Sequence, residues 1–276
     1  MAEITAAMVK ALRERTGLPM MDCKKALQET AGDEQQAVDW LRKQGIKTKE
    51  TRIGRETSAG RVAVYADHAK GVGAMIELMC ESAPVANSPE FVAFANDLAK
   101  QLATGPGAKT AEELLAQKSL SKPSMTFGEQ KDDMFNRIRE VFNLGRILRI
   151  DAPCGAYAHH DGSLGALVEV SGGTADAAKD IAMHVAANKS TAVVRKEDLD
   201  PAAVDKERAI LTEAARAEGK PENIIAKMIE GRLKNFFAEQ VLLEQPFVKD
   251  DKQPVGKIAD AAKMKVVRFE RWELGK

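Results

Sequence analysis

The sequence predicts an α+β protein with a helical N-terminal domain, a two-part core and a protruding antiparallel helical hairpin. Three observations carry this prediction. Short helical segments with capping residues follow one another over residues 1–45. Similar strand-turn-strand patterns, each followed by a helical pattern, occur at 64–78 and 156–170, and two long amphipathic segments occupy 200–245. The core is therefore expected to consist of two related α+β halves.

Residues 1–45 are expected to form a three-helix N-terminal domain. Thr5 can cap the first helix. The third helix opens at Asp33, where Gln36 completes a capping box three residues later, and Gly45 is expected to end it. A unit of this size has a marginal core, so we expect it either to lean on a partner surface or to be a small binding module.

The remaining boundaries follow from changes in periodicity. Residues 46–60 are polar, net basic and aperiodic, so they are interpreted as an exposed linker, with a contact to an acidic partner as the alternative. The first core half is expected over 61–140, and the second over 141–199 together with 246–276. The tail at 265–276 is expected to be a last strand that rejoins the core.

The two halves differ in the joint between the second strand and the helix. The second half uses the short stretch "SGGTAD" at 171–176, whereas the first uses "CESAPVANS" at 80–88, which follows neither a helical nor a strand period. The sister half folds without these extra residues, and loops longer than the fold requires are often binding elements. Pro84 and Pro89 stiffen this loop, which lowers the entropy lost when it docks.

Residues 200–245 are expected to form an antiparallel helical hairpin. Asp200 can cap the first arm, and Pro221 opens the second. Apolar residues on the second arm recur at spacings of three and four, at Ile225, Ile229, Leu233 and Phe236. Each arm of roughly 20 residues would reach ~30 Å, so the hairpin is expected to protrude.

Composition argues against several classes of function. The chain has 41 Lys and Arg against 41 Asp and Glu, and 5% aromatic residues, which argues against a dedicated nucleic-acid binder. No uncharged apolar run approaches about 18 residues, so no membrane span is expected. Three cysteines without a CxxC pair are typical of neither a disulfide framework nor a zinc site, and a start without a signal-peptide core favours a cytoplasmic location.

The sequence contains no pattern that indicates a reaction. It has no Walker loop and no dinucleotide fingerprint, and no carboxylates at metal-site spacing. His159 and His160 share a turn, where an ordinary surface position and a binding contact are both open, and His184 is expected to be a hydrogen-bonded packing residue. We therefore expect no catalytic residues, no metal and no cofactor, and a function based on contact.

Three segments carry a resemblance to a known family. They are "LRERTGLPMMDCKKAL" at 12–27, "IAMHVAANK" at 181–189 and "GKPENIIAKMIEGRLKNFFAEQVLLEQPFV" at 219–248. In content and order they resemble bacterial elongation factor Ts, and the resemblance covers nearly the whole chain. It implies an N-terminal domain of the ubiquitin-associated type, a two-part core and a coiled-coil hairpin that projects from the second part.

The resemblance also implies a function. It implies a guanine-nucleotide exchange factor that binds elongation factor Tu in its GDP-bound and nucleotide-free forms and promotes GDP release by disturbing the Mg²⁺ and phosphate region. The nucleotide and the metal belong to that partner, so this chain would need no cofactor, no direct nucleic-acid contact and no membrane. A homodimer, or a complex with two copies of each protein, is left open.

Partner-binding residues follow by matching positions. Arg13, Met20 and Met21 match N-terminal positions that meet the partner's nucleotide-binding domain, and His159 matches a histidine that approaches its phosphate-loop region. The family typically reads Thr-Asp-Phe-Val after a Cys-Glu or Cys-Gln pair, and the Asp-Phe pair wedges between partner helices near the Mg²⁺ site. This sequence has at those positions Ser82, Ala83, Pro84 and Val85.

The changed loop leaves alternatives open. Burial of a Phe side chain is worth ~1.5–3 kcal/mol, so its replacement would weaken the coupling roughly ten- to hundredfold. Pro84 can still present a rigid apolar knob, and retained binding with a differently built wedge is expected. The alternatives are a non-exchanging elongation factor Tu binder or stabiliser with a degenerate wedge loop, and a ubiquitin-type adaptor that acts through residues 1–45.

Overall fold

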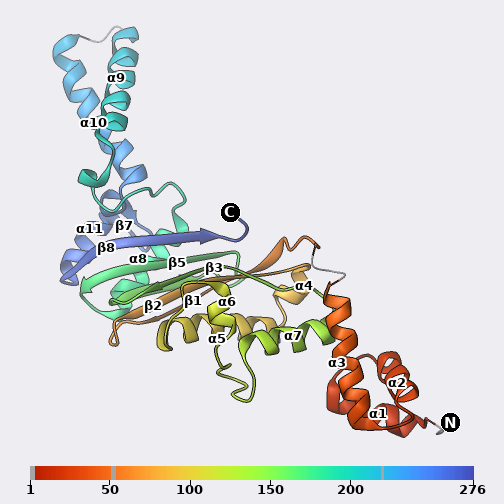
Figure 1. The fold of residues 1–276 in the computed structure, drawn as a ribbon. Coiled ribbons are helices and arrows are strands. Elements are labelled where there is room, and N and C mark those ends of the chain that lie inside the picture. The colour runs from red at the N-terminus through yellow and green to blue at the C-terminus, as the bar shows by residue number, and fades with distance from the viewer. Residues whose placement is uncertain (1–3, 51–53, 219–220) are drawn as a thin grey trace.

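The computed structural model describes residues 4–50, 54–218 and 221–276. Within these ranges, no helix is both long enough and apolar enough to cross a bilayer. The chain forms an N-terminal helical domain, a layered α+β core and a projecting pair of helices (Figure 1). The predicted fold class is confirmed.

Three helices form the N-terminal domain: α1 (Ala6–Thr16), α2 (Met20–Glu29) and α3 (Glu34–Glu50). The predicted cap of the first helix is present, because Thr5 Oγ1 accepts a hydrogen bond from the Met8 N–H. Asp33 Oδ1 accepts from the Gln36 N–H at 2.9 Å, but the Gln36 amide donates to the Asp33 side chain instead of its backbone. Half of the expected capping box is therefore formed. The domain core consists of Val9, Leu12, Leu18, Cys23, Ala26, Leu27, Ala37 and Leu41.

The predicted end of the third helix was wrong. Helix α3 continues through Gly45 to Glu50, so the residues directly after Gly45 are helical and not an aperiodic linker. Gly45 lies against α7, where a Cβ atom would be 2.1 Å from Asn136 Oδ1. The glycine permits this close approach and does not act as a helix stop. Residues 51–53 of the expected linker lie outside the described residues, and β1 begins at Ala59.

Two three-stranded antiparallel sheets form the centre of the core. The first has the order β1-β2-β3, with strands β1 (Ala59–Asp67), β2 (Val72–Cys80) and β3 (Asn143–Ile150). The second has the order β4-β5-β8, with strands β4 (Cys154–Ala158), β5 (Leu164–Gly172) and β8 (Met264–Glu273). Strand β8 pairs along β5 from Leu164 to Gly172, which confirms that the tail rejoins the core.

One predicted boundary between the halves was wrong. Strand β3, which falls in the range 141–199 assigned to the second half, pairs with β2 of the first sheet. The pairing aligns Gly73 with Ile150 and Ile76 with Ile147. Leu144 and Ile147 then pack on the same apolar cluster as β2. The second half therefore begins after β3.

The sheets stack face to face, and helices cover their outer faces. Along β2, Ala74 and Ile76 face the helices, whereas Met75 between them faces the second sheet, as the period of two requires. Gly165 lets the sheets approach, since a Cβ there would lie 2.6 Å from Val62 Cγ1. Helices α5 and α7 lie beneath the first sheet in Figure 1. The covering helices are α5 (Pro89–Thr104), α6 (Ala111–Leu115) and α7 (Phe127–Ile138) on the first sheet, and α8 (Ala175–Ala187) and α11 (Val255–Ala261) on the second.

The predicted hairpin consists of α9 (Pro201–Ala217) and α10 (Glu222–Gln240), which run antiparallel and project from the core (Figure 1). Asp200 caps α9 by accepting from the Ala202 N–H at 3.0 Å. The apolar seam contains Ala215, Ile225, Ile229 and Leu233. The coiled-coil assignment stays a prediction. Short elements flank the hairpin: η1 (Lys196–Asp198), η2 (Leu242–Glu244), β6 (Pro246–Phe247) and β7 (Asp250–Pro254).

His184 joins the base of this hairpin to α8. The ring is buried, its Nε2 lies 2.8 Å from Gln245 Oε1, and its Nδ1 accepts from the Val248 N–H at 3.1 Å. Because Nδ1 accepts, the proton of the neutral ring resides on Nε2. Burial lowers the pKa of His184 and outweighs the opposing hydrogen bond of Gln245. The prediction of a hydrogen-bonded packing histidine is confirmed.

Candidate partner-binding site

The N-terminal domain exposes two methionines at the start of α2. Met20 and Met21 are 51% and 71% exposed, because Cys23, Ala26 and Leu27 form the buried face of this helix. Arg13 of α1 lines the same shallow hollow as both methionines. Flexible apolar side chains beside a cation suit an amphipathic partner surface. The structure thus brings together the three candidate residues of this domain, and their part in binding stays a prediction.

The stretch expected as an irregular loop contains a short helix, α4 (Ala83–Ala86), so that expectation was wrong in part. Pro84 stands in its first turn, where a backbone N–H is not needed. Ala86 is buried, and Val85 packs partly against the core of the first half. Ala83 and Pro84 are exposed. Two of the four candidate residues therefore face solvent, and the others hold the segment in place.

Ser82 anchors the start of α4. Its N–H donates to Glu140 Oε2 at 3.0 Å, and its hydroxyl donates to Glu140 Oε1 at 2.6 Å. In return, the Val141 N–H donates to Glu81 Oε1 at 2.9 Å. Each chain segment thus offers a carboxylate to the other's backbone. Hydrogen bonds to charged acceptors are about twice as strong as neutral ones, so α4 is fixed firmly to the end of α7.

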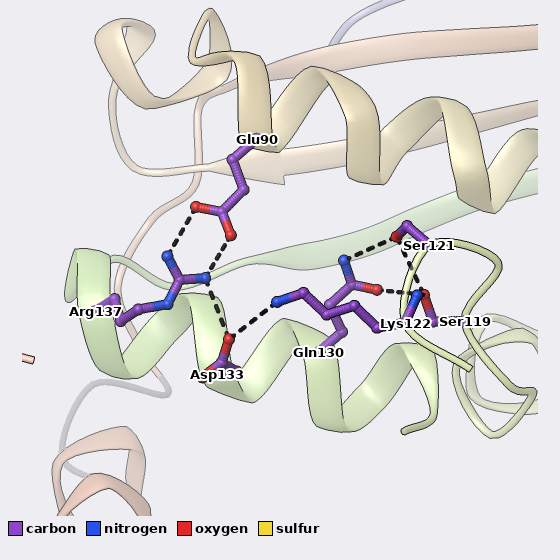
Figure 2. Close-up of polar contacts among 7 residues, drawn as sticks. All are labelled: Glu90, Ser119, Ser121, Lys122, Gln130, Asp133 and Arg137. Atoms are coloured by element: carbon purple, nitrogen blue, oxygen red, sulfur yellow. Dashed lines mark hydrogen bonds and ion pairs between the residues drawn. The ribbon is translucent and has the colours of Figure 1, made fainter. Parts of the chain in front are cut away.

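The end of α7 also contacts the N-terminal domain and the start of α5. Arg139, in a left-handed conformation with φ 65°, ends the helix and pairs with Asp22, one residue after Met21. Figure 2 shows Arg137 held between Glu90 of α5 and Asp133 of its own helix. The Arg137 guanidinium holds the pKa of Glu90 below its usual value. The C-terminal end of α7 therefore positions α4, α5 and the surface formed by Met20 and Met21, called the methionine surface below.

A polar cluster fixes the other part of α7. In Figure 2, the hydroxyl of Ser119 donates to Gln130 Oε1 at 2.6 Å, and Lys122 lies 3.4 Å from Asp133. Ser119 and Gln130 are both buried, so their mutual hydrogen bond satisfies two polar groups that would otherwise be costly inside the fold. Sequence reasoning did not find this cluster or the contacts of Arg137, Arg139 and Glu140. Glu90, Asp22 and Ser82 lie 47 to 117 residues from these partners, and the cluster depends on how the 119–122 segment folds back on α7.

His159 lies in the turn between β4 and β5, as expected. Its Nδ1 is 2.8 Å from Asp161 Oδ1, and its ring centroid is 4.3 Å from that of His160. The Ser163 N–H, the His159 side chain and the Ser163 hydroxyl together hold the pKa of Asp161 far below its usual value. The carboxylate thus stays charged beside the His159 ring.

This turn and α4 lie close together. Arg61 of β1 donates to Asn87 Oδ1, directly after α4, at 3.2 Å and to the His160 carbonyl at 3.0 Å. The Val62 N–H also donates to the Gly162 carbonyl at 2.8 Å. The candidate residues at 82–85 and the candidate His159 therefore belong to one connected region, although the segments are remote in sequence.

Groups that often carry chemistry are structural in this region. Burial raises the pKa of the Cys80 thiol to about 11 and that of Cys154 to about 12, so both stay protonated at neutral pH. In the described part of the chain, no group of three or more His, Cys, Asp or Glu side chains is arranged to hold a metal ion.

The fold and these surfaces define an α+β protein with a three-helix N-terminal domain, two stacked sheets covered by helices and a helical hairpin, with its candidate contact residues on connected elements. The family model of elongation factor Ts matches residues 81–276. The chain belongs to the elongation factor Ts family, whose members are translation elongation factors. The resemblance drawn from the three sequence segments is thus confirmed.

Similar proteins match along the full chain. Elongation factor Ts of Methylococcus capsulatus is 42% identical over 274 residues, which cover 99% of this chain and 92% of that protein. Elongation factor Ts of Micrococcus luteus is 42% identical over 284 residues and is covered completely, as is this chain. The protein from Renibacterium salmoninarum is 41% identical over 283 residues, again with complete coverage.

Proposed function

We propose that this protein is a guanine-nucleotide exchange factor that binds elongation factor Tu in its GDP-bound form and promotes GDP release during translation elongation. It acts through contacts and not as an enzyme, in the cytoplasm, without its own cofactor. The observation that supports the proposal best is the fixed arrangement of α4. Its exposed Ala83 and Pro84 stand between two anchors, Glu140 and Arg61, beside the turn that holds His159.

Nucleotide exchange requires that the factor bind the nucleotide-free and GDP-bound forms of its partner with different affinities. A protein that binds the nucleotide-free GTPase more tightly than the GDP-bound form weakens GDP binding by the same factor. A shift from 1:99 to 99:1 requires a difference of about 5.5 kcal/mol. Several contacts must share this difference, and we assign it to Arg13, Met20 and Met21, to residues 82–85, and to His159.

Pro84 and Ala83 offer a smaller wedge than an acid and an aromatic residue. We propose that rigidity offsets part of the missing contact area. Ser82 is bonded twice to Glu140, and Val85 and Ala86 pack on the core, so α4 loses little conformational freedom when it docks. The wedge then acts near the Mg²⁺ and phosphate region of elongation factor Tu through shape and not through charge.

The second candidate function is a non-exchanging binder or stabiliser of elongation factor Tu. It is favoured by one observation, the absence of both the acid and the aromatic side chain at Ala83 and Pro84. This binder would use the Met20 and Met21 surface and leave GDP in place.

A stopped-flow assay separates the two functions. Fluorescently labelled GDP is loaded on elongation factor Tu and chased with unlabelled GDP while this protein is titrated. The exchange factor is expected to accelerate release many-fold, to a plateau. Titration calorimetry with GDP-bound and nucleotide-free partner runs in parallel. Binding of equal strength to both forms, with no acceleration at saturation, would contradict exchange and favour the stabiliser. Light scattering then tests whether the protein forms a homodimer or a complex with two copies of each protein, which the sequence left open.

A further inference from the structure

Arg61 occupies a junction between two elements that are remote in sequence. It lies on β1 and is partly buried. Its Nη1 donates to Asn87 Oδ1 at 3.2 Å and approaches the Ala86 carbonyl at 3.5 Å, and its Nη2 donates to the His160 carbonyl at 3.0 Å. One guanidinium group therefore spans the end of α4 and the turn between β4 and β5.

Further contacts extend this link into α4 and into the turn between β4 and β5. On one side, the Asn87 amide donates to the Ala83 carbonyl at 3.0 Å, so the constraint reaches the residue before Pro84. On the other, Gly162 has φ 77°, and a Cβ atom there would lie 2.7 Å from Arg61 Cζ. The turn thus reserves the space of a side chain for the guanidinium.

The geometry selects arginine over other cations. The three acceptors are neutral oxygens on two separate elements, and a rigid planar fork can reach them at once. A lysine ammonium is a point charge on a flexible stem and would satisfy one element at the expense of the other. The hydrogen bonds of Arg61 therefore hold the end of α4 and the turn between β4 and β5 at a fixed distance. They do not pair the guanidinium with an opposite charge.

We propose that Arg61 is a positioning residue that holds α4 and the 159–163 turn at a fixed separation, so that Pro84 and His159 meet the partner as one unit. This inference rests on the proposed exchange function. Without Arg61 the two elements would still fold, but each would have to be ordered separately on docking. The entropy lost in ordering them would reduce the binding energy that drives GDP release.

The first experiment measures exchange with Arg61→Met and Arg61→Lys in the full chain. The matched control is Arg149→Met. Arg149 also lies in the first sheet and donates to two backbone carbonyls, Leu102 at 3.0 Å and Gly105 at 2.9 Å. Arg61→Met is expected to lower the plateau rate of GDP release about tenfold while the half-saturating concentration changes less than about threefold. Arg61→Lys should behave like Arg61→Met, and Arg149→Met like the unmodified protein.

The second experiment does not depend on exchange. Hydrogen exchange of the isolated protein, read by mass spectrometry, should become faster in Arg61→Met within both 83–87 and 159–163, and in neither segment in Arg149→Met. Should Arg61→Met fold poorly, Asn87→Ala removes the bond from Arg61 to Asn87 Oδ1, together with the Asn87 bond to the Ala83 carbonyl, and leaves the bond from Arg61 to the His160 carbonyl in place. It should then lower the plateau rate while the 159–163 turn keeps its protection.

Three results would overturn the inference: an unchanged plateau rate in Arg61→Met, equal losses in Arg61→Met and Arg149→Met, or full rescue by Arg61→Lys. Loosening of one of the two segments without the other in Arg61→Met would be a fourth such result. If the unmodified protein fails to accelerate release, the proposed function fails, and the hydrogen-exchange result still decides whether Arg61 couples the two elements.

Discussion

The two halves of the core share a plan but join strand to helix in different ways. The second half passes from β5 to α8 through Gly172 and Gly173, at φ 73° and 78°, and then through Thr174, which caps α8. The first half inserts α4 at the same point and anchors it to Glu140 and Arg61. The difference teaches that the fold needs only a tight turn here, so α4 is an addition to the shared plan, and the proposed function assigns a contact role to it.

A second comparison concerns the glutamate that both repeats carry. Glu77 pairs with Arg146 of the neighbouring strand, and Glu169 pairs with Arg268 in the equivalent place. Glu77 is 5% exposed and also accepts from the Gly275 N–H at 2.8 Å. Burial alone would raise the pKa of Glu77, but the bonds and charge of Arg146 and the Gly275 N–H outweigh it and hold the pKa below its usual value. The first pair therefore also ties the sheets together.

The largest expected effect tests this second comparison. Glu77→Gln leaves Arg146 without its counter-charge in a partly buried site and should lower the free energy of unfolding by about 2–3 kcal/mol. Glu169→Gln breaks a more exposed pair and should cost under about 1 kcal/mol. Urea unfolding followed by circular dichroism measures both. Equal losses would show that the two pairs are equivalent.

The next effect tests the joint. The double change Ala83→Asp with Pro84→Phe restores an acid and an aromatic residue at the exposed end of α4. It should raise the plateau rate of GDP release roughly ten- to hundredfold, in line with the burial of a Phe side chain. The control is Ala202→Asp with Ala203→Phe, at exposed positions on α9, which should leave the rate unchanged. A lower rate in the α4 variant would contradict the placement of the wedge.

A smaller effect concerns the pH dependence of stability, which should differ between the two halves of the core. His184 lies only in the second half, and its neutral form is favoured in the folded state, so its folded pKa is below the unfolded value of about 6.5. Stability is unaffected above about pH 6.5 and falls as the pH drops below it, because the unfolded chain then binds more protons. The loss should approach about 1 kcal/mol per pH unit. Urea unfolding at several pH values measures it.

The control for this prediction is the exposed His160. His160→Gln should keep the dependence of stability on pH, whereas His184→Leu should remove it even if it lowers stability at neutral pH. Hydrogen exchange in mild acid should show the hairpin base near Gln245 and Val248 opening before the first sheet. Simultaneous opening of both halves would contradict the assignment to His184.

The smallest effect concerns the first half's link to the N-terminal domain. Asp22→Asn removes the partly exposed pair with Arg139, which is worth under about 1 kcal/mol. The half-saturating concentration for GDP release should rise about two- to fivefold while the plateau rate is kept, because the methionine surface is then less well placed. Glu34→Gln, which breaks the exposed pair of Glu34 with Arg15 in the same domain, is the control. A change of plateau rate would argue for a part of this domain in the exchange step itself.

The sequence by itself determined the local elements and their order. Caps at Thr5, Thr110, Thr174 and Asp200 each bond a backbone N–H two or three residues away, so a short window contains the whole interaction. The repeat of Glu77 and Glu169, the hairpin and the burial of His184 follow from periodicity in the same way. The candidate residues came from the resemblance to the family. It matches positions along the sequence and does not say which of them are in contact.

Only the tertiary structure decided which segments meet. The pairing of β3 with β2, the passage of α3 through Gly45, and the helix α4 were missed because each depends on a surface supplied from elsewhere in the chain. Arg61 is 99 residues from His160, and Glu140 is 58 residues from Ser82. A local pattern records the backbone preference of its own residues, whereas these contacts arise from the stacking of two sheets, which no short window of sequence contains.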